Sequence, residues 1–342
     1  MKQRLGWLCA SVCALALHPL ALAQPTPVAA PSAMRQDGRD VAQWLMRMHE
    51  ASRHRTYAGT FVVSSANGDM SSSRIWHACD GQRQVERIEA LTGAPRTTFR
   101  YNDQVVTFLP QSRQVLQERR ESLRLFPELL KSPDAQISDY YFARFLGSDR
   151  VADVDADVML LAPRDRMRFG YRIWSEKETG LLLKLQTLDT DGRTLEQSAF
   201  SELQLNANVN IERLIEMMGA TQGYSVQRLE PVSTSTAAQG WVFRSGVAGF
   251  RLMSCLLRPT TTLVHEGGTG APALQWAFSD GLASVSLFAQ PLDRPGPAQE
   301  VSMVMGATRL LSRRVQDWVL TAVGEVPLQT LQALSRSLER SH

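Results

Sequence analysis

Histidine and acidic side chains near the start of the chain are the first candidates for chemistry. His49 and Glu50 are followed by His54, which resembles the helical zinc motif of metalloproteases. That motif needs its two imidazoles four residues apart, so that both lie on one helical face and bind one zinc ion. Here they are five residues apart, which turns them roughly 140° from each other on the α-helical repeat. The spacing predicts exposed histidines and no zinc site.

Two acidic runs carry some of the carboxylates of a calcium loop. The run 153–157 alternates Asp with Val and Ala, and it lacks the Gly and the distal Glu of an EF-hand. The run 189–192 has a Gly but none of the later ligands. Both are interpreted as turns. His77 lies in a β-like stretch and would suit a pH sensor, but nothing nearby in the sequence supports that role.

The common catalytic motifs are missing from the sequence. There is no Gly-x-Ser-x-Gly elbow, no phosphate loop and no dinucleotide glycine pattern. An envelope hydrolase would need a clustered nucleophile and base, which the sequence does not offer. We therefore predict a protein that is not an enzyme and needs no cofactor or metal.

The N-terminal residues have the pattern of a secretory signal. Lys2 and Arg4 precede an apolar run over 5–21, and Ala21-Leu22-Ala23 fits the small-x-small cleavage rule. The run is short and interrupted by polar residues, which disfavours a membrane span. We predict a signal peptide over 1–23, a flexible leader over 24–38, and a periplasmic mature chain.

Two cysteines remain after cleavage, Cys79 and Cys255. An oxidising compartment would allow a disulfide between them, which would fix the orientation of two domains. The alternative is two buried, unpaired thiols that act as small hydrophobes. The sequence does not decide between the two, because the Cα separation is not visible in it.

The composition predicts a sizeable core and excludes a strong charge field. Of 342 residues, 44% are hydrophobic and the formal net charge is +3. This balance argues against nucleic acid as a partner. Small clusters such as Arg119-Arg120 and Arg313-Arg314 are typical of solvated surface, with anionic lipid or an acidic partner as the minority alternative.

A helix and a series of strands are predicted for the first domain, over 39–218. Asp40 and Gln43 form a capping box ahead of an apolar face that includes Trp44. Helical stretches are expected at 126–130 and 137–146. Strands are expected at 60–63, 73–79, 84–91, 104–109, 113–118, 149–152, 157–161, 168–174, 181–188 and 194–205. Short turns between them predict an antiparallel, strongly curved sheet, a half-open barrel with helices across its mouth.

A second, smaller domain is predicted over 241–342. Residues 206–218 are a short helix or spacer, and 219–240 form a linker. Strands are expected at 250–257, 274–278, 284–289, 307–313 and 317–323. Pro327 opens a last helix whose Leu stripe would cover the sheet. The fold class is therefore α+β.

A curved sheet under helices offers an apolar cavity, and the first domain has aromatic side chains that could line it. Each of them alone is more often core than ligand-facing. As a set they fit a filled core or an acyl-chain pocket. The lipid-cavity candidates are Trp44, Phe61, Trp76, Phe108, Phe126, Tyr141, Phe145 and Trp174.

Several segments, in order along the mature chain, resemble the RseB/MucB family of sigma-E regulators. The first domain supplies Gly59-Thr60-Phe61-Val62, Ile75-Trp76-His77, Arg150-Val151-Ala152, Leu161-Ala162-Pro163-Arg164-Asp165, Arg168-Phe169-Gly170-Tyr171, Thr179-Gly180-Leu181-Leu182-Leu183-Lys184 and Leu195-Glu196. The second supplies Gly249-Phe250, Asp280-Gly281-Leu282-Ala283 and Val323-Gly324-Glu325-Val326-Pro327. One segment departs from the pattern, because the family's Trp-x-Pro-x-Gly-Phe is stretched here between Trp241 and Gly249.

The resemblance implies a lipoprotein-carrier-like half-barrel followed by a smaller sheet-and-helix domain. It implies a negative regulator of the envelope stress response that binds the periplasmic part of a membrane-spanning anti-sigma factor and shields it from regulated proteolysis. Lipopolysaccharide or lipoprotein acyl chains would release it. The alternative is a periplasmic carrier of lipid or lipoprotein to the outer membrane, and a homo-oligomer is left open. The partner-binding candidates are Trp241, Phe250, Arg258, Asp280 and Gly281.

Overall fold

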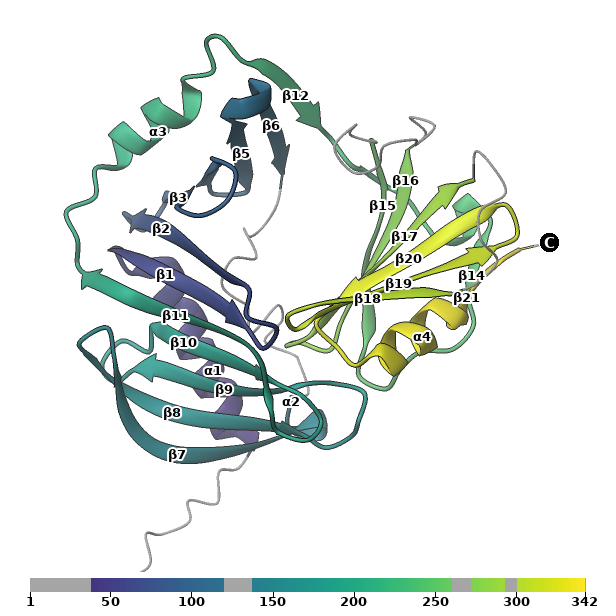
Figure 1. Cartoon of the computed structure of the whole chain (residues 1–342), viewed down its shortest axis with the longest axis horizontal. Helices are drawn as coiled ribbons and strands as arrows, with labels where there is room; N and C mark the ends of the chain where they lie inside the picture. The colour runs from purple at the N-terminus through teal and green to yellow at the C-terminus, as the bar shows by residue number, and fades with distance from the viewer. Residues whose placement is uncertain (1–37, 120–136, 260–271, 293–299, 342) are drawn as a thin grey trace, which may run out of the picture. The chain divides into compact units, whose positions relative to one another are not determined.

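The computed structural model describes residues 38–119, 137–259, 272–292 and 300–341, and these form two main sheets with a few helices (Figure 1). The helix expected at 126–130, with the lipid candidate Phe126, lies outside the described residues. The described part is mostly sheet, as the α+β prediction requires. No described helix combines the length and apolar character needed to cross a membrane.

The first sheet has twelve strands in the order β12-β6-β5-β4-β3-β2-β1-β11-β10-β9-β8-β7. Neighbours are antiparallel except for the parallel pair β12 and β6. Within the described residues β12 and β7 are its two edges, so the sheet is not a closed barrel. Its strands are β1 Tyr57–Ser65, β2 Met70–Cys79, β3 Gln84–Ala90, β4 Thr97–Tyr101, β5 Gln104–Leu109, β6 Gln114–Arg119, β7 Tyr141–Val151, β8 Val154–Pro163, β9 Gly170–Glu176, β10 Leu182–Leu188, β11 Thr194–Leu205 and β12 Ser225–Leu229.

Turn residues set the hairpins of this sheet where the sequence predicted them. The 67–69 turn joins β1 to β2, and Gly68 has the positive φ of +92° that such a turn demands. The interpretation of the acidic run 153–157 as a turn holds only for Asp153, because strand β8 begins at Val154. Ala152 and Asp153, with φ of 48° and 64°, form the two-residue turn between β7 and β8. The 189–192 run closes the hairpin of β10 and β11.

The prediction of a helix over 137–146 is wrong for most of its length. The helix α2 covers only Ile137–Tyr140, and the chain continues as strand β7 from Tyr141. Aromatic residues at 141, 142 and 145 favour an extended chain that can pair with β8. Gly147, with φ of +117°, then forms a bulge in that pairing.

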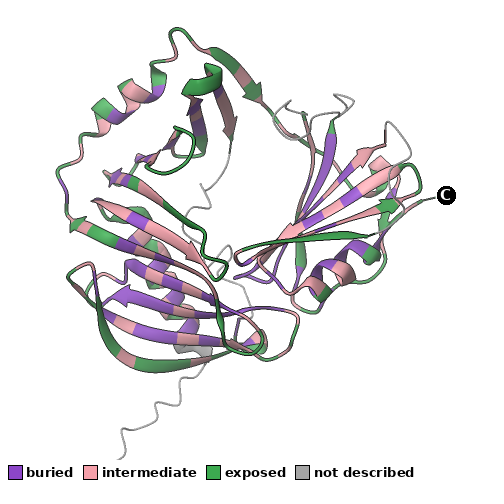
Figure 2. Ribbon diagram, in the orientation of Figure 1, coloured by how far each residue is buried: buried purple, intermediate pink, exposed green. Residues whose placement is uncertain are grey.

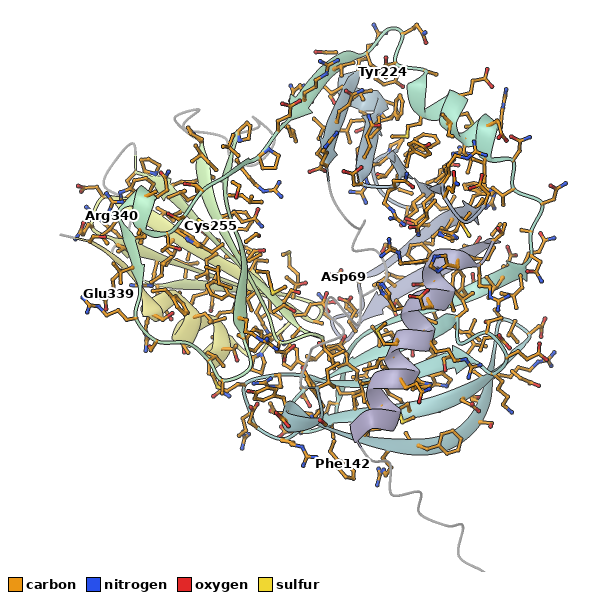
Figure 3. The ribbon with its side chains drawn as sticks, turned by 180° about the vertical axis from the view of Figure 1, so that it is seen from behind. Asp69, Phe142, Tyr224, Cys255, Glu339 and Arg340 are labelled. Carbon is orange, nitrogen blue, oxygen red and sulfur yellow. The ribbon has the colours of Figure 1, made fainter. Side chains whose placement is uncertain are left out.

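Two helices cover parts of the first sheet. Helix α1, Gly38–His54, packs Val41, Leu45 and Met48 against β8, β9 and β10, and Figure 3 shows it lying across the strands. Figure 2 shows the concentration of buried residues in these strands. Helix α3, Ile211–Gly219, is capped by Asn210, whose side chain accepts a hydrogen bond from the Arg213 N–H. It packs Leu214 and Met218 over β3 and β4.

The predicted linker is largely tied into the two sheets. Strand β12 pairs with β6 of the first sheet, and strand β13, Val232–Ser233, pairs with β15 of the second. The chain therefore changes sheet over Glu230 and Pro231. A Pro at this point is reasonable, because it has no N–H to contribute to either ladder.

The second sheet has seven antiparallel strands in the order β13-β15-β16-β17-β20-β19-β18. Helix α4, Leu328–Ser337, packs Leu331 and Leu334 onto β19 and β20, and both side chains are fully buried. A separate pair, β14 Trp241–Phe243 with β21 Leu338–Arg340, closes one side of this core. The remaining strands are β15 Arg251–Arg258, β16 Ala273–Ser279, β17 Ser284–Pro291, β18 Val301–Met305, β19 Thr308–Val315 and β20 Trp318–Gly324, with short 3-10 turns at Pro110–Ser112 and Ala237–Gln239.

Replacement of Leu334 by Ala should lower the free energy of unfolding by about 2–5 kcal/mol, because it leaves a cavity beneath α4. Urea unfolding followed by circular dichroism measures the loss. The matched control is Met70→Ala, since that side chain is 70% exposed and should give little change. Equal losses in the two variants would contradict the packing described here.

Candidate functional site

A buried ion pair joins the two sheets. Arg168 lies in the loop between β8 and β9, and Asp280 lies in the turn between β16 and β17. Arg168 Nη1 donates to Asp280 Oδ2 at 2.9 Å, and both side chains are fully buried. Removing two charges from water is costly, so such a pair persists only where every polar atom finds a partner. We call this pair and its direct contacts the seam.

The turn that carries Asp280 is built to hold its carboxylate. Asp280 Oδ1 accepts hydrogen bonds from the backbone N–H of Leu282 and of Ala283, at 2.9 and 2.7 Å. Gly281 supplies the positive φ of +101° that the turn needs, and its N–H donates to Ser279 Oγ. Burial raises the pKa of Asp280, while these donors and the Arg168 guanidinium favour its charged form.

Tyr141 of β7 completes the coordination of the carboxylate. Its hydroxyl donates to Asp280 Oδ2 at 2.9 Å. Burial raises the pKa of Tyr141 well above its usual value, and the charge of Asp280 adds to the effect. The phenol therefore stays a neutral donor. Tyr141, predicted as a lipid contact, is thus part of the seam, and its lipid role stays a prediction.

The rest of the Arg168 guanidinium is also satisfied. Nε donates to Asp165 Oδ1 at 3.1 Å, and Nη2 donates to the Ala248 carbonyl at 2.5 Å. The guanidinium carbon lies 4.4 Å from the ring centroid of Tyr140 and 5.3 Å from that of Phe250, which allows cation–π attraction.

Gly249 permits this close approach. A Cβ on Gly249 would lie 2.8 Å from the Tyr140 ring and 3.0 Å from Arg168 Nη1, and its φ is +86°. No other residue fits there without moving the seam.

The first turn of α4 adds a second set of contacts to the same loop. Thr330 Oγ1 donates to the Met167 carbonyl at 2.5 Å, and the Gln329 side-chain amide donates to the Arg166 carbonyl. The loop before β9 is thus held by both the turn of Asp280 and helix α4.

The seam brings together three of the five partner-binding candidates: Phe250, Asp280 and Gly281. Trp241 is fully buried in the second core, 5.5 Å from the ring of Trp276, apart from the seam. Arg258 lies on β15, where its side chain donates to Gln275 and lies 3.9 Å from Glu118 of β6. Sequence reasoning missed the role of Arg168. In the sequence it is only part of a family-like segment, and nothing local marks a partner 112 residues away.

The lipid-cavity candidates do not converge. Trp44 and Tyr141 pack with α1, while Phe61 belongs to a cluster around β1 and β2. Trp76 and Phe108 pack beneath α3, and Trp174 lies in a cluster with Leu183. Phe145 is 47% exposed on the edge strand β7. A shared lipid site on these residues remains a prediction.

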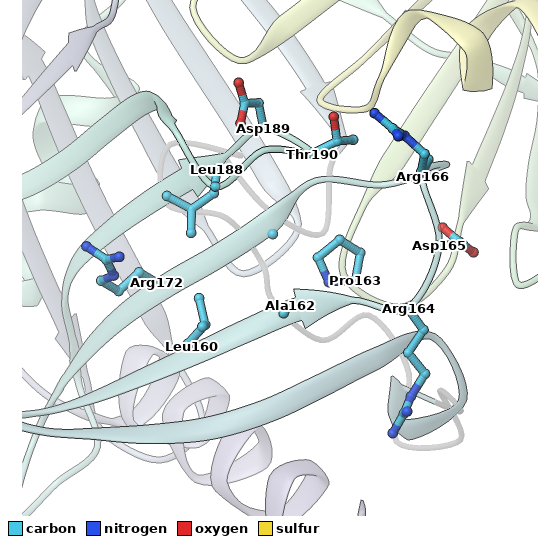
Figure 4. A pocket seen from close by; sticks show the side chains of 12 residues that line it. Leu160, Ala162, Pro163, Arg164, Asp165, Arg166, Arg172, Leu188, Asp189 and Thr190 are labelled. Carbon is cyan, nitrogen blue, oxygen red and sulfur yellow. The ribbon is translucent and has the colours of Figure 1, made fainter.

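An open hollow of about 460 Å³ lies on the first sheet (Figure 4). Leu160, Ala162 and Arg172 line it, and they alternate with the residues that face α1, so it occupies the opposite face of β8 and β9. None of the lipid candidates borders it. Its full lining is Leu160, Ala162, Pro163, Arg164, Asp165, Arg166, Gly170, Arg172, Leu188, Asp189, Thr190 and Gly192.

The acidic and basic side chains around the hollow differ in how they are paired within the protein. Asp165 accepts hydrogen bonds from Arg168 and from the Met167 N–H, and Asp189 accepts them from two backbone N–H groups of its own turn. Arg164 points away from the hollow in Figure 4 and donates to the Ser138 carbonyl. The guanidinium groups of Arg166 and Arg172 lie beside the apolar side chains that line the hollow. The hollow therefore suits a small apolar group with an acidic head.

Two histidines of the first domain, His77 and His54, lie in different surroundings. His77 is buried, with Nδ1 2.6 Å from the Arg55 carbonyl and Nε2 2.9 Å from the Gln84 amide, and burial lowers its pKa. His54 is exposed beside Glu50. No cluster of three or more metal-binding side chains occurs among the described residues.

The disulfide that the sequence left open is not formed in the structure. Cys79 lies on β2 of the first sheet and Cys255 on β15 of the second, and both are free thiols. Burial raises the pKa of Cys255, which packs in the second core. Cys79 is only half-buried, so the second alternative of buried thiols that act as small hydrophobes matches Cys255 but not Cys79.

Comparison with known proteins matches both parts of the chain. The model of the MucB/RseB N-terminal domain matches residues 40–218, and that of the MucB/RseB C-terminal domain matches residues 235–339. The sigma factor AlgU regulatory protein MucB of Pseudomonas aeruginosa is 28% identical over 304 residues, which cover 87% of this chain and 90% of the relative. The sigma-E factor regulatory protein RseB of Escherichia coli is 26% identical over 297 residues, covering 86% and 89%.

A solved structure matches at the level of the fold as well. It is the crystal structure of MucB in complex with MucA(peri), with a TM-score of 0.67 and 27% identity. The match covers 89% of this chain and 100% of that chain.

Asp280→Asn should lower the free energy of unfolding by about 3–5 kcal/mol, because it removes the buried counter-charge of the Arg168 guanidinium and leaves only the partly exposed Asp165. Urea unfolding measures the change. The control is Glu216→Gln, which removes the exposed partner of Arg213 and should change little. If both variants lose the same small amount, the seam does not have the energetic weight assigned to it.

Proposed function

Since the chain belongs to the MucB/RseB family, we propose that it is a negative regulator of sigma-E-type envelope stress signalling. It binds the periplasmic part of a membrane-spanning anti-sigma factor and shields it from regulated proteolysis. The observation that carries the proposal is the match to the MucB that was crystallised with MucA(peri), which extends over the whole of that chain. Both family models also match in order.

The proposal includes a location and a domain organisation. Residues 1–23 are a signal peptide and 24–38 a leader, so that the mature chain reaches the periplasm. Residues 39–218 form a half-open barrel covered by helices, 219–240 a linker, and 241–342 the partner-binding domain. The packing of α1 and α3 on the first sheet, and the position of β7 and β12 at its edges within the described residues, support the half-open form.

A binding role fits the chemistry of the seam better than a catalytic one. Arg168, Asp280 and Tyr141 bond to one another in full burial, which leaves none of them poised toward a substrate. A fully buried network of this kind fixes one arrangement of the two sheets. A partner that recognises this arrangement binds in proportion to the fraction of molecules that hold it.

Release by a lipid signal requires that the lipid bind the partner-free form better than the bound form. The hollow offers a place for an acyl chain with an acidic head. It shares Asp165 with the seam, because that side chain both lines the hollow and accepts the bond from Arg168. A ligand there could therefore alter the arrangement that the partner recognises.

The mature chain, residues 24–342, should bind the purified periplasmic segment of the anti-sigma factor of its own envelope and slow its cleavage by the first regulated protease. Titration calorimetry gives the affinity, and gel analysis gives the cleavage rate. Asp280→Asn should weaken binding at least tenfold, because fewer molecules hold the seam. Met70→Lys, an exposed change, should leave both readouts unchanged.

An absence of binding by the unaltered chain would refute the regulatory function. Co-purification of a lipoprotein in place of a single-span membrane protein would favour the alternative, a lipid or lipoprotein carrier.

Lipopolysaccharide should lower the affinity for the anti-sigma segment at least tenfold, whereas neutral phosphatidylcholine vesicles should not. Arg172→Gln should reduce this effect, since Arg172 is one of the two guanidiniums beside the hollow. The measurement is a competition titration in both lipids. Release of equal size in wild type and Arg172→Gln would place the lipid elsewhere.

A further inference from the structure

The first half of strand β7 exposes a group of large apolar side chains for which the proposed function gives no role. Phe142, Phe145 and Leu146 are 52%, 47% and 41% exposed. Among the described residues β7 pairs only with β8, so these side chains lie at a free edge of the first sheet (Figure 1). We call residues 142–146 the β7 edge. Exposed apolar groups gathered in this way mark an interaction surface.

The β7 edge presents apolar groups on both sides of the strand. Phe142 pairs with Ala162, which lines the hollow, so Phe142 lies on the face of the hollow. Phe145 pairs with Met159, which packs with α1, so Phe145 lies on the opposite face. Leu146 follows as the extra residue of the bulge. A partner that contacts all three side chains must therefore meet the strand edge-on.

Guanidinium groups flank these apolar side chains. Arg144, between the two Phe residues, is exposed and has no carboxylate partner among the described residues. The Arg164 guanidinium carbon lies 5.9 Å from the ring centroid of Phe142, and its Nε donates to a backbone carbonyl of α2. Arg172 lies in the same cross-strand row as Arg144, because both pair with Leu160 of β8. Three guanidiniums therefore lie on or beside the face that carries Phe142.

Carboxylates are few at this end of the strand. Asp139 of α2 is exposed, and Asp165 is held by the hydrogen bond from Arg168. The acidic residues of the β7–β8 hairpin, over 149–157, lie at the other end of the strand. The β7 edge is therefore positively charged, whereas the far end of β7 is acidic.

An aromatic edge beside guanidiniums matches the surface of an anionic bilayer. Aromatic side chains favour the depth of the headgroups, and Arg binds phosphates through paired hydrogen bonds. The free N–H and C=O groups of the edge limit that depth, because headgroups and water can bond to them and hydrocarbon cannot. A strand of another protein fits less well, since the bulge at Leu146 interrupts the row of edge groups with which it would pair.

Strand β18 offers a comparison within the same chain. It is an edge of the second sheet among the described residues, and Val301, Met303, Val304 and Met305 are 50–61% exposed. Residues 301–305 contain no charged side chain. This strand thus has the apolar component of the β7 edge without the basic one.

We propose that the β7 edge docks the chain onto the surface of an anionic phospholipid bilayer. Phe142, Phe145 and Leu146 enter the headgroup region, and Arg144 and Arg164 bind lipid phosphates. The acidic far end of β7 is repelled by the same phosphates, which sets the direction of approach. This surface goes beyond the proposed function, whose contacts are the anti-sigma segment and a single lipid in the hollow.

Vesicle co-sedimentation tests the proposal. It uses the mature chain, residues 24–342, because the apolar signal segment would bind vesicles by itself. At low salt, the partition coefficient for vesicles of mixed phosphatidylglycerol and phosphatidylcholine should exceed that for pure phosphatidylcholine at least tenfold. Raised salt should remove most of this difference, since it screens exposed charges.

A matched pair of charge variants tests the basic component. Arg144→Glu should lower the partition coefficient for the anionic vesicles at least tenfold, because it replaces an attraction by a repulsion at the bilayer surface. Arg228→Glu makes the same change of charge at an exposed position on β12, the opposite edge of the same sheet, and should have little effect.

A matched pair of double variants tests the apolar component. Phe142→Thr with Phe145→Thr should also lower the partition coefficient at least tenfold, while Thr keeps a high strand propensity. Met303→Thr with Val304→Thr on β18 removes two apolar side chains of similar exposure and should keep wild-type binding.

Absence of binding to the anionic vesicles, or equal binding to both kinds of vesicle, would overturn the proposal. Equal losses in Arg144→Glu and Arg228→Glu would do the same, because they would indicate attraction by net charge alone. If the Phe142 and Phe145 double variant does not fold, the arginine pair decides the matter. Dimerisation of the wild-type chain without vesicles, lost in that double variant, would assign the edge to a second copy instead. No anti-sigma segment or lipopolysaccharide is present, so the outcome is independent of the proposed regulation.

Discussion

The burial of one charged pair is the constraint on which the contact between the two sheets depends. Arg168 and Asp280 have no access to water, so the surrounding chain must supply every hydrogen bond that water would have made. That requirement explains several features of the sequence at once. The turn of Gly281 aims two N–H groups at the carboxylate, and Gly249 leaves room for the guanidinium between the rings of Tyr140 and Phe250. Each feature is local in sequence, but its reason is a partner in the other sheet.

The contact between the two sheets is held by more hydrogen bonds at the seam than at the β18–β19 turn. At Arg168 each guanidinium nitrogen has an acceptor, Asp165, Asp280 or the Ala248 carbonyl, which favours a single rigid arrangement. At the β18–β19 turn, one hydrogen bond from the Ala307 N–H to Glu196 Oε2, at 3.2 Å, joins the second sheet to the first. Local opening should therefore be easier at that turn than at Arg168.

Local patterns predicted most of the secondary structure, and the exceptions have physical causes. The hairpin at Gly68 and the helix after Pro327 follow from turn and capping chemistry, which is short-range. The end of strand β7 was predicted, but its first part, residues 141–148, was missed because this aromatic segment has no strand period of its own and becomes extended by pairing with β8. The sequence indicated only one side of the seam. Asp280 and Gly281 were candidates as a turn, but an ion pair across 112 residues leaves no trace in spacing.

Several of the segments on which the family resemblance rests lie between the two sheets. Arg164-Asp165, the Arg168–Tyr171 segment, Gly249-Phe250 and the turn of Asp280 come from distant parts of the chain, and all lie at or beside the seam. A core alone would not need this, because cores tolerate exchange among apolar residues of similar volume. A charged network does not, since each member leaves the others unpaired when it changes. It follows that what distinguishes this fold from a generic pair of packed sheets is how the sheets are held together. Under the proposed function, a partner that recognises this arrangement would therefore depend on these side chains more than on the rest of the core.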